Sequence, residues 1–287
     1  MRWQQLVEQV KALQPDWDVA EFGAFRYLEG GYSNANYRFR YHGGEFVLRL
    51  PGKPSAYTDR EREERFYRSV RSLPAPEVVA FDSRTGAMIS RWISGRLLAD
   101  HEPELERAAG YLRDLHARLR AAEADAAGAL DRAYDPLVHA RASLAAASAP
   151  GWIRRIADAR VWAPPSVTVC HNDLNPWNVI VSASDPTRWC TLDWEFAGDN
   201  DPLFDLTCLA EGLGWSLEET DELIDTYLEL IESARTPTTS QRRTIRKAYF
   251  LREYAWALAQ LAAGNRRPEI EAQLKRSEAA LNDLRGS

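Results

Sequence analysis

Two short polar clusters, each placed at the end of a β-branched or apolar run, are the feature of this 287-residue chain that most restricts its fold. The first cluster, residues 171–178, follows the run 167–170, and the second, residues 193–195, follows a further apolar run after a short turn. Runs of this kind, bounded by turn residues, predict strands. We therefore expect a strand, a loop, a hairpin and a second loop that bring both clusters to one edge.

The residue types in these clusters suit phosphoryl transfer from ATP. Such transfer needs a carboxylate near the attacking hydroxyl and oxygen ligands that hold magnesium on the phosphates. Asp173 can orient the hydroxyl, while Asn178 and Asp193 can hold the metal. A histidine two residues before Asp173 and an Asp-Trp-Glu sequence one hairpin later make the constellation specific. The alternative is a pair of solvated turns between strands, where Asp and Asn are also common.

Composition restricts the partners and the compartment. The formal net charge of -6 and the pI near 5.5 argue against a general nucleic-acid binder. The first residues carry charge, and an apolar run of about 18 residues is absent, so neither a signal peptide nor a membrane span is expected. Cys170, Cys190 and Cys208 lack metal or redox spacing and predict buried thiols. We therefore expect a cytoplasmic protein.

The N-terminal part predicts a helix followed by an antiparallel sheet. Apolar residues at helical spacing over residues 3–13 predict a packed leader helix, and five strand patterns follow up to about residue 96. The first two strands are joined by a segment rich in Gly, Ser and Asn, which can turn donors toward phosphate oxygens. Ser33, Asn34 and Asn36 in this segment are candidate ATP contacts.

A cation and a carboxylate in this part are candidates for a phosphate-binding pair. Arg49 lies on the third predicted strand, and Glu63 lies on the helix predicted after the capping box at residues 58–61. In a kinase small lobe, such a carboxylate holds the third-strand cation against the α and β phosphates. A solvated helix face is the alternative for Glu63. Arg91 and Ile93 end the last strand, where a linker backbone would meet adenine.

From Pro103 onward the pattern is mainly helical. Apolar residues recur at helical spacing over 105–119 and place His116 on the apolar face, where a core histidine is the favoured interpretation. Short helices are expected before residue 165. Longer ones are expected after Asp201, and the chain shows no internal repeat or low-complexity linker.

Together these motifs resemble the aminoglycoside phosphotransferase and choline kinase superfamily, small-molecule relatives of the eukaryotic-type protein kinases. The resemblance is most specific over residues 171–178 and 192–206, and it is nearest to bacterial choline kinase and thiamine kinase-like proteins. It implies an α+β, protein-kinase-like fold of two lobes. Residues 1–93 would form a small, five-stranded antiparallel lobe that binds nucleotide, and residues 94–287 a mainly helical lobe for catalysis and acceptor binding.

The resemblance also implies roles for individual residues. Asp173 matches the catalytic aspartate, Asn178 and Asp193 match the magnesium ligands, and Glu195 is a possible second carboxylate at the metal. The positions that match ATP contacts are Ser33, Asn34, Asn36, Arg49, Glu63, Arg91 and Ile93. ATP and Mg²⁺ are therefore the expected cofactors.

The acceptor site is less well matched. Choline kinases surround a quaternary ammonium with aromatic rings, partly from a Trp-x-x-Trp pair on a late helix. Here the matching stretch contains Tyr254 and Trp256, and the second tryptophan is missing. The Asp-Asn-Asp-Pro sequence at residues 199–202 resembles the choline kinase version of the metal loop. Acceptor contacts are expected from Trp194, Glu195, Tyr254 and Trp256.

The resulting hypothesis is a kinase that transfers the γ-phosphate of ATP to a hydroxyl of a small cationic alcohol such as choline, ethanolamine or thiamine. An aminoglycoside or sugar phosphotransferase is one alternative. A nucleotide-binding pseudokinase is another, although its expected loss of catalytic residues is not seen. A protein kinase is disfavoured because the chain has no Ala-Pro-Glu signature and a helix is predicted soon after Asp193. The acceptor, the oligomeric state and the pathway stay open.

Overall fold

A computed structural model describes residues 1–29, 34–52, 58–69, 73–125, 133–158, 161–164 and 166–285. The chain forms two compact units that alternate along the sequence. Unit 1 comprises Met1–Glu102, Ala121–Leu130 and Pro176–Phe196, and unit 2 comprises Pro103–Arg120, Asp131–Asn175 and Ala197–Ser287. The lobe boundary between residues 93 and 94 stays a prediction from the sequence.

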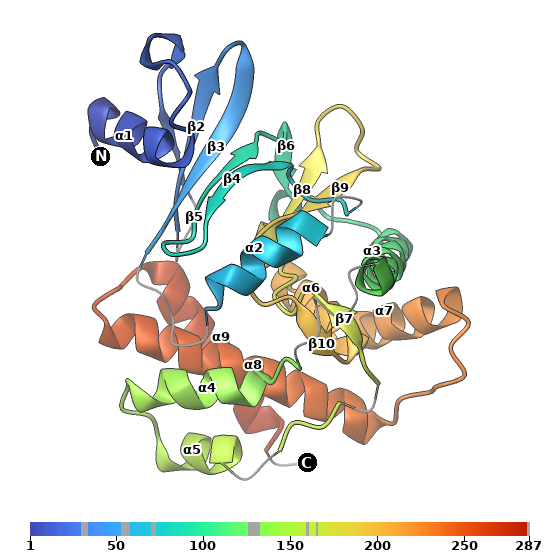
Figure 1. Ribbon diagram of the computed structural model, residues 1–287. Helices are drawn as coiled ribbons and strands as arrows, with labels where there is room; N and C mark the ends of the chain where they lie inside the picture. Colours follow the sequence, from blue (N-terminus) through green and yellow to red (C-terminus); the bar gives the residue numbers. More distant parts are fainter. Residues whose placement is uncertain are drawn as a thin grey trace. The chain divides into compact units, whose positions relative to one another are not determined.

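Unit 1 is built around a five-stranded antiparallel sheet with the order β1-β2-β3-β5-β4 (Figure 1). The strands are β1 (Arg26–Leu28), β2 (Asn34–Tyr41), β3 (Gly44–Pro51), β4 (Val78–Asp82) and β5 (Ala87–Arg91). Phe39, Leu48 and Ile89 on the three central strands are fully buried. The predicted kinase-like sheet is therefore confirmed.

Two helices accompany this sheet. The leader helix α1 (Trp3–Leu13) packs against β4 and β5, and buries Leu6, Val7 and Val10 in the same core as Phe39. This is the apolar face that its helical spacing predicted. The second helix, α2 (Arg60–Ser69), contacts β4.

The strand before the first polar cluster and the hairpin after that cluster belong to different sheets. The hairpin strands β8 (Val179–Ser182) and β9 (Trp189–Thr191) form a three-stranded sheet with β6 (Gly95–Leu97). The strand order in this sheet is β6-β8-β9. The first sheet was expected to run up to about residue 96, but its last strand in the chain, β5, ends at Arg91, and Gly95–Leu97 belongs to another sheet. A Cβ at Gly95 would lie 2.1 Å from the carbonyl oxygen of Val181, so only glycine allows β6 to approach β8 this closely.

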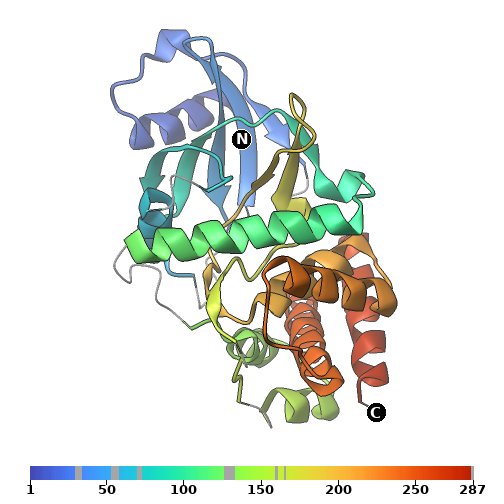
Figure 2. The same cartoon turned by 90° about the vertical axis from the view of Figure 1, so that its right-hand side faces the viewer.

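Unit 2 is mainly helical. Its strand β7 (Thr168–Cys170) pairs with β10 (Gly198–Asn200), so β7 does not share a sheet with the hairpin. The two predicted polar clusters therefore follow strands of different sheets. The helices are α4 (Pro136–Ala145), α5 (Gly151–Asp158), α6 (Pro202–Leu213), α7 (Leu217–Leu230), α8 (Thr239–Ala262) and α9 (Pro268–Asp283). Most of the long helix α3 (Leu105–Asp125), green in Figure 2, also belongs to this unit.

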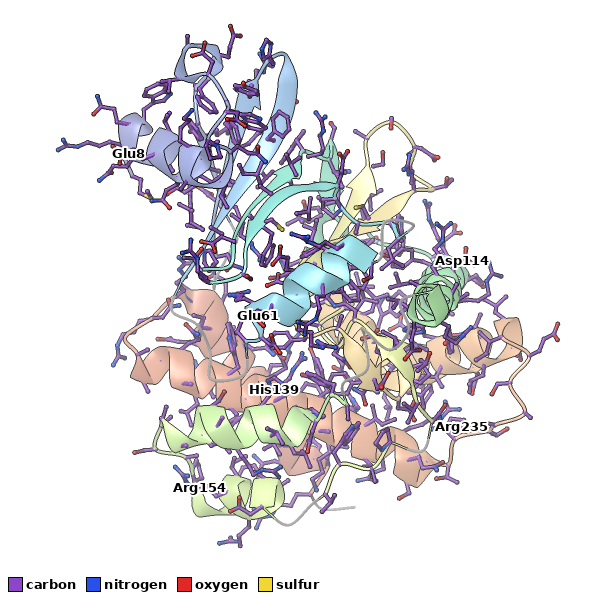
Figure 3. The ribbon with its side chains drawn as sticks, in the orientation of Figure 1. Glu8, Glu61, Asp114, His139, Arg154 and Arg235 are labelled. Atoms are coloured by element: carbon purple, nitrogen blue, oxygen red, sulfur yellow. The ribbon has the colours of Figure 1, made fainter. Side chains whose placement is uncertain are left out.

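The packing of unit 2 centres on α6 and α8. Every residue from 202 to 211 of α6 is buried, as expected for a helix surrounded by protein. The long helix α8 contacts α4, α6 and α9. Within the described residues, none of the helices combines the length and the apolar character that a membrane crossing requires. Helices of both units carry exposed charged side chains, such as Glu61 on α2 and Asp114 on α3 (Figure 3).

Candidate functional site

The guanidinium of Arg49, on β3, is buried between two carboxylates. Its Nη2 lies 2.7 Å from Oε1 of Glu63 on α2, and its Nη1 lies 3.2 Å from Oδ1 of Asp193. Nη2 also donates to the carbonyl oxygen of Gly86 at 3.2 Å. Burial alone would lower the pKa of Arg49, but Glu63 and Asp193 together hold that pKa above its usual value. Arg49 is therefore a fixed, permanently charged cation.

A second arginine, Arg60, links Glu63 to Glu195. Its Nη1 lies 2.6 Å from Oε2 of Glu63 and 3.0 Å from Oε2 of Glu195. Burial raises the pKa of Glu195 to about 8, and the nearby charge of Asp193 acts in the same direction, while Arg60 opposes both. Gly86 has a φ of +78°, and a Cβ there would lie 2.4 Å from Nε of Arg60, so this position favours glycine. Sequence reasoning missed both Arg60 and Gly86.

A backbone hydrogen bond links Asn178 to Leu192, the residue just before Asp193, so the two predicted metal ligands lie on connected segments. Asn178 ends the short 3₁₀ helix Pro176–Asn178, and its carbonyl oxygen accepts the NH of Leu192 at 2.7 Å. The next residue, Asp193, has a φ of 57°, in the left-handed region that few non-glycine residues adopt. Asn34 donates its side-chain amide to Oδ2 of Asp193 at 3.5 Å. Carboxylate and amide oxygens are donors that Mg²⁺ accepts, so this pair fits the expected metal.

The other predicted ATP contacts belong to the same unit. Asn36 is the cross-strand neighbour of Arg49 in the β2–β3 register. Arg91 is the last residue of β5, with 51% of its side chain exposed, and Ile93 follows it by two residues. Ser33 lies outside the described residues. Their contacts with nucleotide stay predictions.

In unit 2, the loop after β7 carries Asp173 and is held by Asp205 of α6. Oδ2 of Asp205 accepts the backbone NH of His171 and Oδ1 accepts that of Asn172, each at 2.7 Å. Asn172 itself adopts a left-handed φ of 66°. The NH of Asp173 donates to Nδ1 of His171 at 3.1 Å. The two residues before Asp173 are therefore fixed by a single buried carboxylate.

His116 of α3 also contacts Asp205. Its Nε2 lies 3.1 Å from Oδ2 of Asp205, and its Nδ1 lies 2.9 Å from the hydroxyl of Tyr227. An ionised carboxylate can only accept hydrogen bonds, so we assign the ring proton of His116 to Nε2. The hydroxyl of Tyr227 then donates to Nδ1. His116 is fully buried, in agreement with its interpretation as a core histidine. Burial alone would raise the pKa of Asp205, but the hydrogen bonds from His116 and His171 outweigh it and lower that pKa.

The predicted acceptor residues differ in their accessibility. Trp194 is fully buried, and its ring stacks on Phe66 with centroids 4.9 Å apart. Its Nε1 donates to the carbonyl oxygen of Thr191 at 3.2 Å. These contacts favour packing over the predicted acceptor contact for Trp194. On α8, Tyr254 is only 3% exposed, whereas Trp256 is partly exposed.

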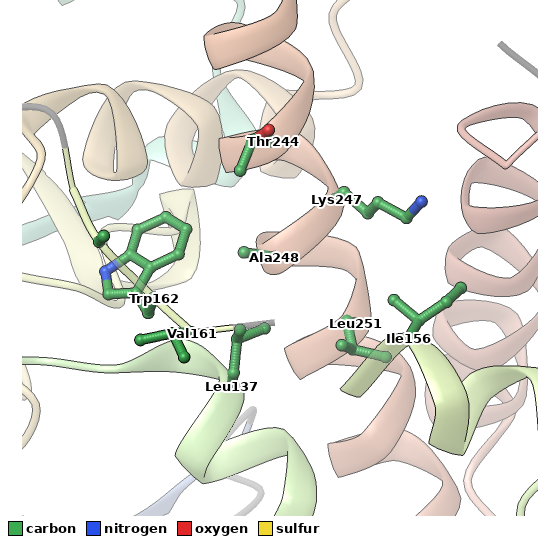
Figure 4. A pocket seen from close by; sticks show the side chains of 9 residues that line it. Leu137, Ile156, Val161, Trp162, Thr244, Lys247, Ala248 and Leu251 are labelled. Atoms are coloured by element: carbon green, nitrogen blue, oxygen red, sulfur yellow. The ribbon is translucent and has the colours of Figure 1, made fainter. Parts of the chain in front are cut away.

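A separate pocket of about 260 Å³ lies elsewhere in unit 2 (Figure 4). Its described lining consists of Leu137, Ile156, Val161, Trp162, Ala163, Thr244, Lys247, Ala248 and Leu251. This lining includes none of the predicted site residues. The candidate functional residues therefore form two separate groups, one around Arg49 in unit 1 and one around Asp173 in unit 2.

A five-stranded antiparallel sheet with a buried arginine, together with a helical unit that holds an aspartate loop, defines a protein-kinase-like fold. Residues 24–240 match the family described as the phosphotransferase enzyme family, and the chain belongs to this family. The resemblance seen in the sequence is therefore confirmed at the level of the family.

Individual relatives agree with this assignment. Protein LicA of Haemophilus influenzae is 43% identical over 58 residues, which are 20% of this chain and only 21% of that protein. A choline/ethanolamine kinase family protein from Mesorhizobium loti has a TM-score of 0.71 at 23% identity, over 100% of this chain and 96% of that one. Choline kinase LicA from Streptococcus pneumoniae has a TM-score of 0.72 at 18% identity, over 98% of both chains. At these identities, the comparison shows that this chain has the same fold as both solved structures.

Proposed function

We propose that this protein is a small-molecule kinase that transfers the γ-phosphate of ATP to a hydroxyl group. The observation that carries the proposal is the buried Arg49, held charged by Glu63 and Asp193. In kinases, a strand cation that is fixed by a helix carboxylate binds the α and β phosphates, and a nearby aspartate holds the metal. Membership of the phosphotransferase enzyme family supports the same reaction class.

Each residue then has a defined task. Arg49 binds the phosphates, and Glu63 keeps its guanidinium in place. Asn178 and Asp193 would hold Mg²⁺, which supplies charge neutralisation on the β and γ phosphates when it is bound. Asp173 accepts a hydrogen bond from the acceptor hydroxyl and takes its proton. The hydroxyl oxygen forms a bond to the γ-phosphorus, the bond to the β–γ bridging oxygen breaks, and ADP leaves.

We further propose that the acceptor is a small cationic alcohol such as choline, ethanolamine or thiamine. The similarity of the fold to a choline/ethanolamine kinase family protein and to a choline kinase supports choline or ethanolamine. The partly exposed Trp256 could offer a ring face to a cation, an interaction worth about 0.5 to 2 kcal/mol. An aminoglycoside or amino sugar is also cationic, so it belongs in the same test.

The experiment is a measurement of ADP release from MgATP with choline, ethanolamine, thiamine, aminoglycosides and amino sugars in turn. One cationic alcohol should stimulate ADP release well above the rate with ATP alone. Asp173→Asn should lower that rate on the order of 100-fold or more while the protein stays folded. Asp185→Asn, in the exposed turn between β8 and β9, is the matched control and should keep the wild-type rate.

Two results would contradict the proposal. Nucleotide binding without stimulation by any acceptor of the panel would favour a pseudokinase. A folded Asp173→Asn variant that turns over at the wild-type rate would remove Asp173 from the catalytic role.

A further inference from the structure

Arg252 is a buried cation in the middle of α8, and its position was not expected from the sequence. Only 8% of its surface is exposed. A buried guanidinium is costly unless its donors are paired. The contacts of Arg252 therefore show which groups its charge stabilises. The contacts described below all lie within unit 2.

Two of these contacts reach the catalytic loop. Nη2 of Arg252 lies 3.1 Å from Oδ1 of Asp173. Nη1 donates to the carbonyl oxygen of Asn172, the residue just before Asp173. Nη1 also donates to the hydroxyl of Tyr134 at 3.1 Å. The guanidinium therefore binds both the backbone and the carboxylate of the loop.

A carboxylate on the other side holds the guanidinium. Oε1 of Glu253 accepts from Nη2 of Arg252 at 2.7 Å and from Nε at 3.0 Å. Oε2 of Glu253 accepts from the side-chain amide of Gln273 on α9 at 3.0 Å. A continuous line of polar contacts thus runs from α9 through α8 to Asp173.

Aromatic rings also lie beside the guanidinium. Its Cζ lies 5.3 Å from the ring centroid of Phe204 and 5.7 Å from that of Tyr249, distances at which a cation is attracted to a ring face. The ring of Tyr134 is itself stacked on His139 of α4, with centroids 4.8 Å apart. Arg252 is therefore held by ring contacts as well as by its hydrogen bonds.

We propose that Arg252 is a positioning residue of the phosphoryl-transfer site, which fixes the rotation of the Asp173 carboxylate and places a positive charge beside it, with Glu253 and Gln273 holding Arg252 in place. This inference rests on the proposed function, because it assumes that Asp173 receives the hydroxyl proton. A planar guanidinium suits the task, since it binds two acceptors in a fixed geometry. Orientation of this kind can be worth about 100-fold in rate.

The charges around the pair permit a test by pH. Among the described residues of unit 2, the titratable or charged groups around Asp173 and Arg252 include Tyr134, His171, Asp205, Cys208, Tyr249 and Glu253. Burial raises the pKa of Tyr134, Cys208 and Tyr249, so these three groups are uncharged near neutral pH. Burial alone would lower the pKa of Arg252, but Tyr134, Glu253 and Asp173 hold it well above its usual value. Arg252 is thus the cation that favours ionised Asp173 at this site.

The test compares Arg252→Gln and Arg252→Lys with the wild-type protein, using MgATP and the acceptor that the panel selects. Arg252→Gln should lower kcat about 10- to 100-fold and leave the KM for ATP within about twofold. The acidic limb of its kcat/KM profile should move to higher pH by about one unit, because Asp173 loses its cation. Arg252→Lys should recover the position of the acidic limb, since the charge remains, and recover kcat only in part.

Arg246→Gln is the matched control. Arg246 also lies on α8, is paired with Glu211 and lies over the ring of Phe250 at 5.4 Å, but it makes no contact with Asp173 among the described interactions. Its replacement should lower the melting temperature and leave both kcat and the pH profile unchanged. A similar melting temperature for both Gln variants with different kinetics would support positioning by Arg252.

The inference and the proposed function fail in different ways. If Asp173→Asn is inactive but Arg252→Gln keeps the wild-type kcat and acidic limb, the inference is overturned and the proposed function stands. If Asp173→Asn keeps the wild-type rate, the proposed function fails first. Should Arg252→Gln not fold, Arg252→Lys decides: an unchanged kcat overturns the inference, and a reduced kcat with an unchanged KM for ATP supports it.

Discussion

The backbone NH of His171 donates to Oδ2 of Asp205 at 2.7 Å, although 34 positions separate the two residues in the chain. Oδ1 of the same carboxylate accepts the next NH, that of Asn172. Two successive peptide groups ahead of Asp173 are therefore held from α6 by one side chain. Because both oxygens act only as acceptors when the carboxylate is ionised, the loop geometry depends on the charge of Asp205.

Asp205→Asn should destabilise the protein by about 2 to 4 kcal/mol, because an amide can accept one of the two NH groups and turns a donor toward the other. Urea unfolding at neutral pH measures the loss. Asp225→Asn is the control: Asp225 pairs with Arg242 on the surface, with 57% of its side chain exposed, and should cost less than about 1 kcal/mol. Equal stability of Asp205→Asn and wild type would show that the loop does not depend on this carboxylate.

The same carboxylate predicts a pH dependence. The pKa of Asp205 is lowered in the folded protein, whereas an unfolded aspartate titrates near a pKa of about 3.9. Its stabilising contribution is therefore complete above the unfolded pKa and is lost as the pH falls through the lower, folded pKa. The difference in unfolding free energy between wild type and Asp205→Asn should be constant above about pH 5 and should shrink below about pH 4. A difference that grows on acidification would contradict the assignment.

The features that could be predicted from the sequence have local, periodic signals. The apolar spacing of α1 places Leu6, Val7 and Val10 on one face, and burial of that face produces the pattern. The pairing of Arg49 with Glu63 was implied by the resemblance to kinases, because the helix charges alone left a solvated face for Glu63 as the alternative. Apolar periodicity also predicted the five-stranded sheet and the long C-terminal helices.

The features that could not be predicted depend on contacts between distant residues. Arg252 lies 79 positions from Asp173, and a charged residue on a helix ordinarily indicates a solvated face. Asp205 lies in the first turn of α6, where an acidic residue is ordinary, so its position in the sequence does not indicate a contact with a distant loop. The strand β6 has three residues, too few for a period of two to be recognised.

Replacement of Asp193 tests the metal assignment. Asp193→Ala should lower MgATP-dependent turnover by about 100-fold or more and raise the magnesium concentration needed for half-maximal rate, because the predicted carboxylate ligand is lost. Arg49 keeps Glu63 and the carbonyl of Gly86 as partners, so the fold should survive. A magnesium titration at saturating ATP measures both effects. An unchanged rate with an unchanged magnesium requirement would exclude Asp193 as a ligand.

The three cysteines should be unreactive in the folded protein. Cys170, Cys190 and Cys208 are free and buried. Burial raises the pKa of Cys190 to about 12 and raises the pKa of Cys170 and Cys208 well above the usual value. Since the thiolate is the reactive form, a thiol reagent near neutral pH should label all three only after unfolding in denaturant. Rapid labelling of the native protein would show that at least one thiol is accessible.

The last prediction concerns the acceptor and compares two tryptophans. Trp256 is partly exposed on α8, whereas Trp194 is fully buried against Phe66. If Trp256 offers its ring to a cationic acceptor, Trp256→Ala should raise the acceptor KM about tenfold, the effect of losing about 1.4 kcal/mol. The KM for ATP should hardly change, because the lost contact is made to the acceptor alone.

Trp194→Ala provides the contrast, because it removes a buried ring and should cost about 3 to 5 kcal/mol of stability. Thermal unfolding and steady-state kinetics on both variants separate the two roles. A Trp256→Ala protein that melts at a lower temperature yet keeps its acceptor KM would show that Trp256 packs in the same way as Trp194. The proposal of a cationic acceptor would then lose its support from this chain's own residues and would rest on the similar structures alone.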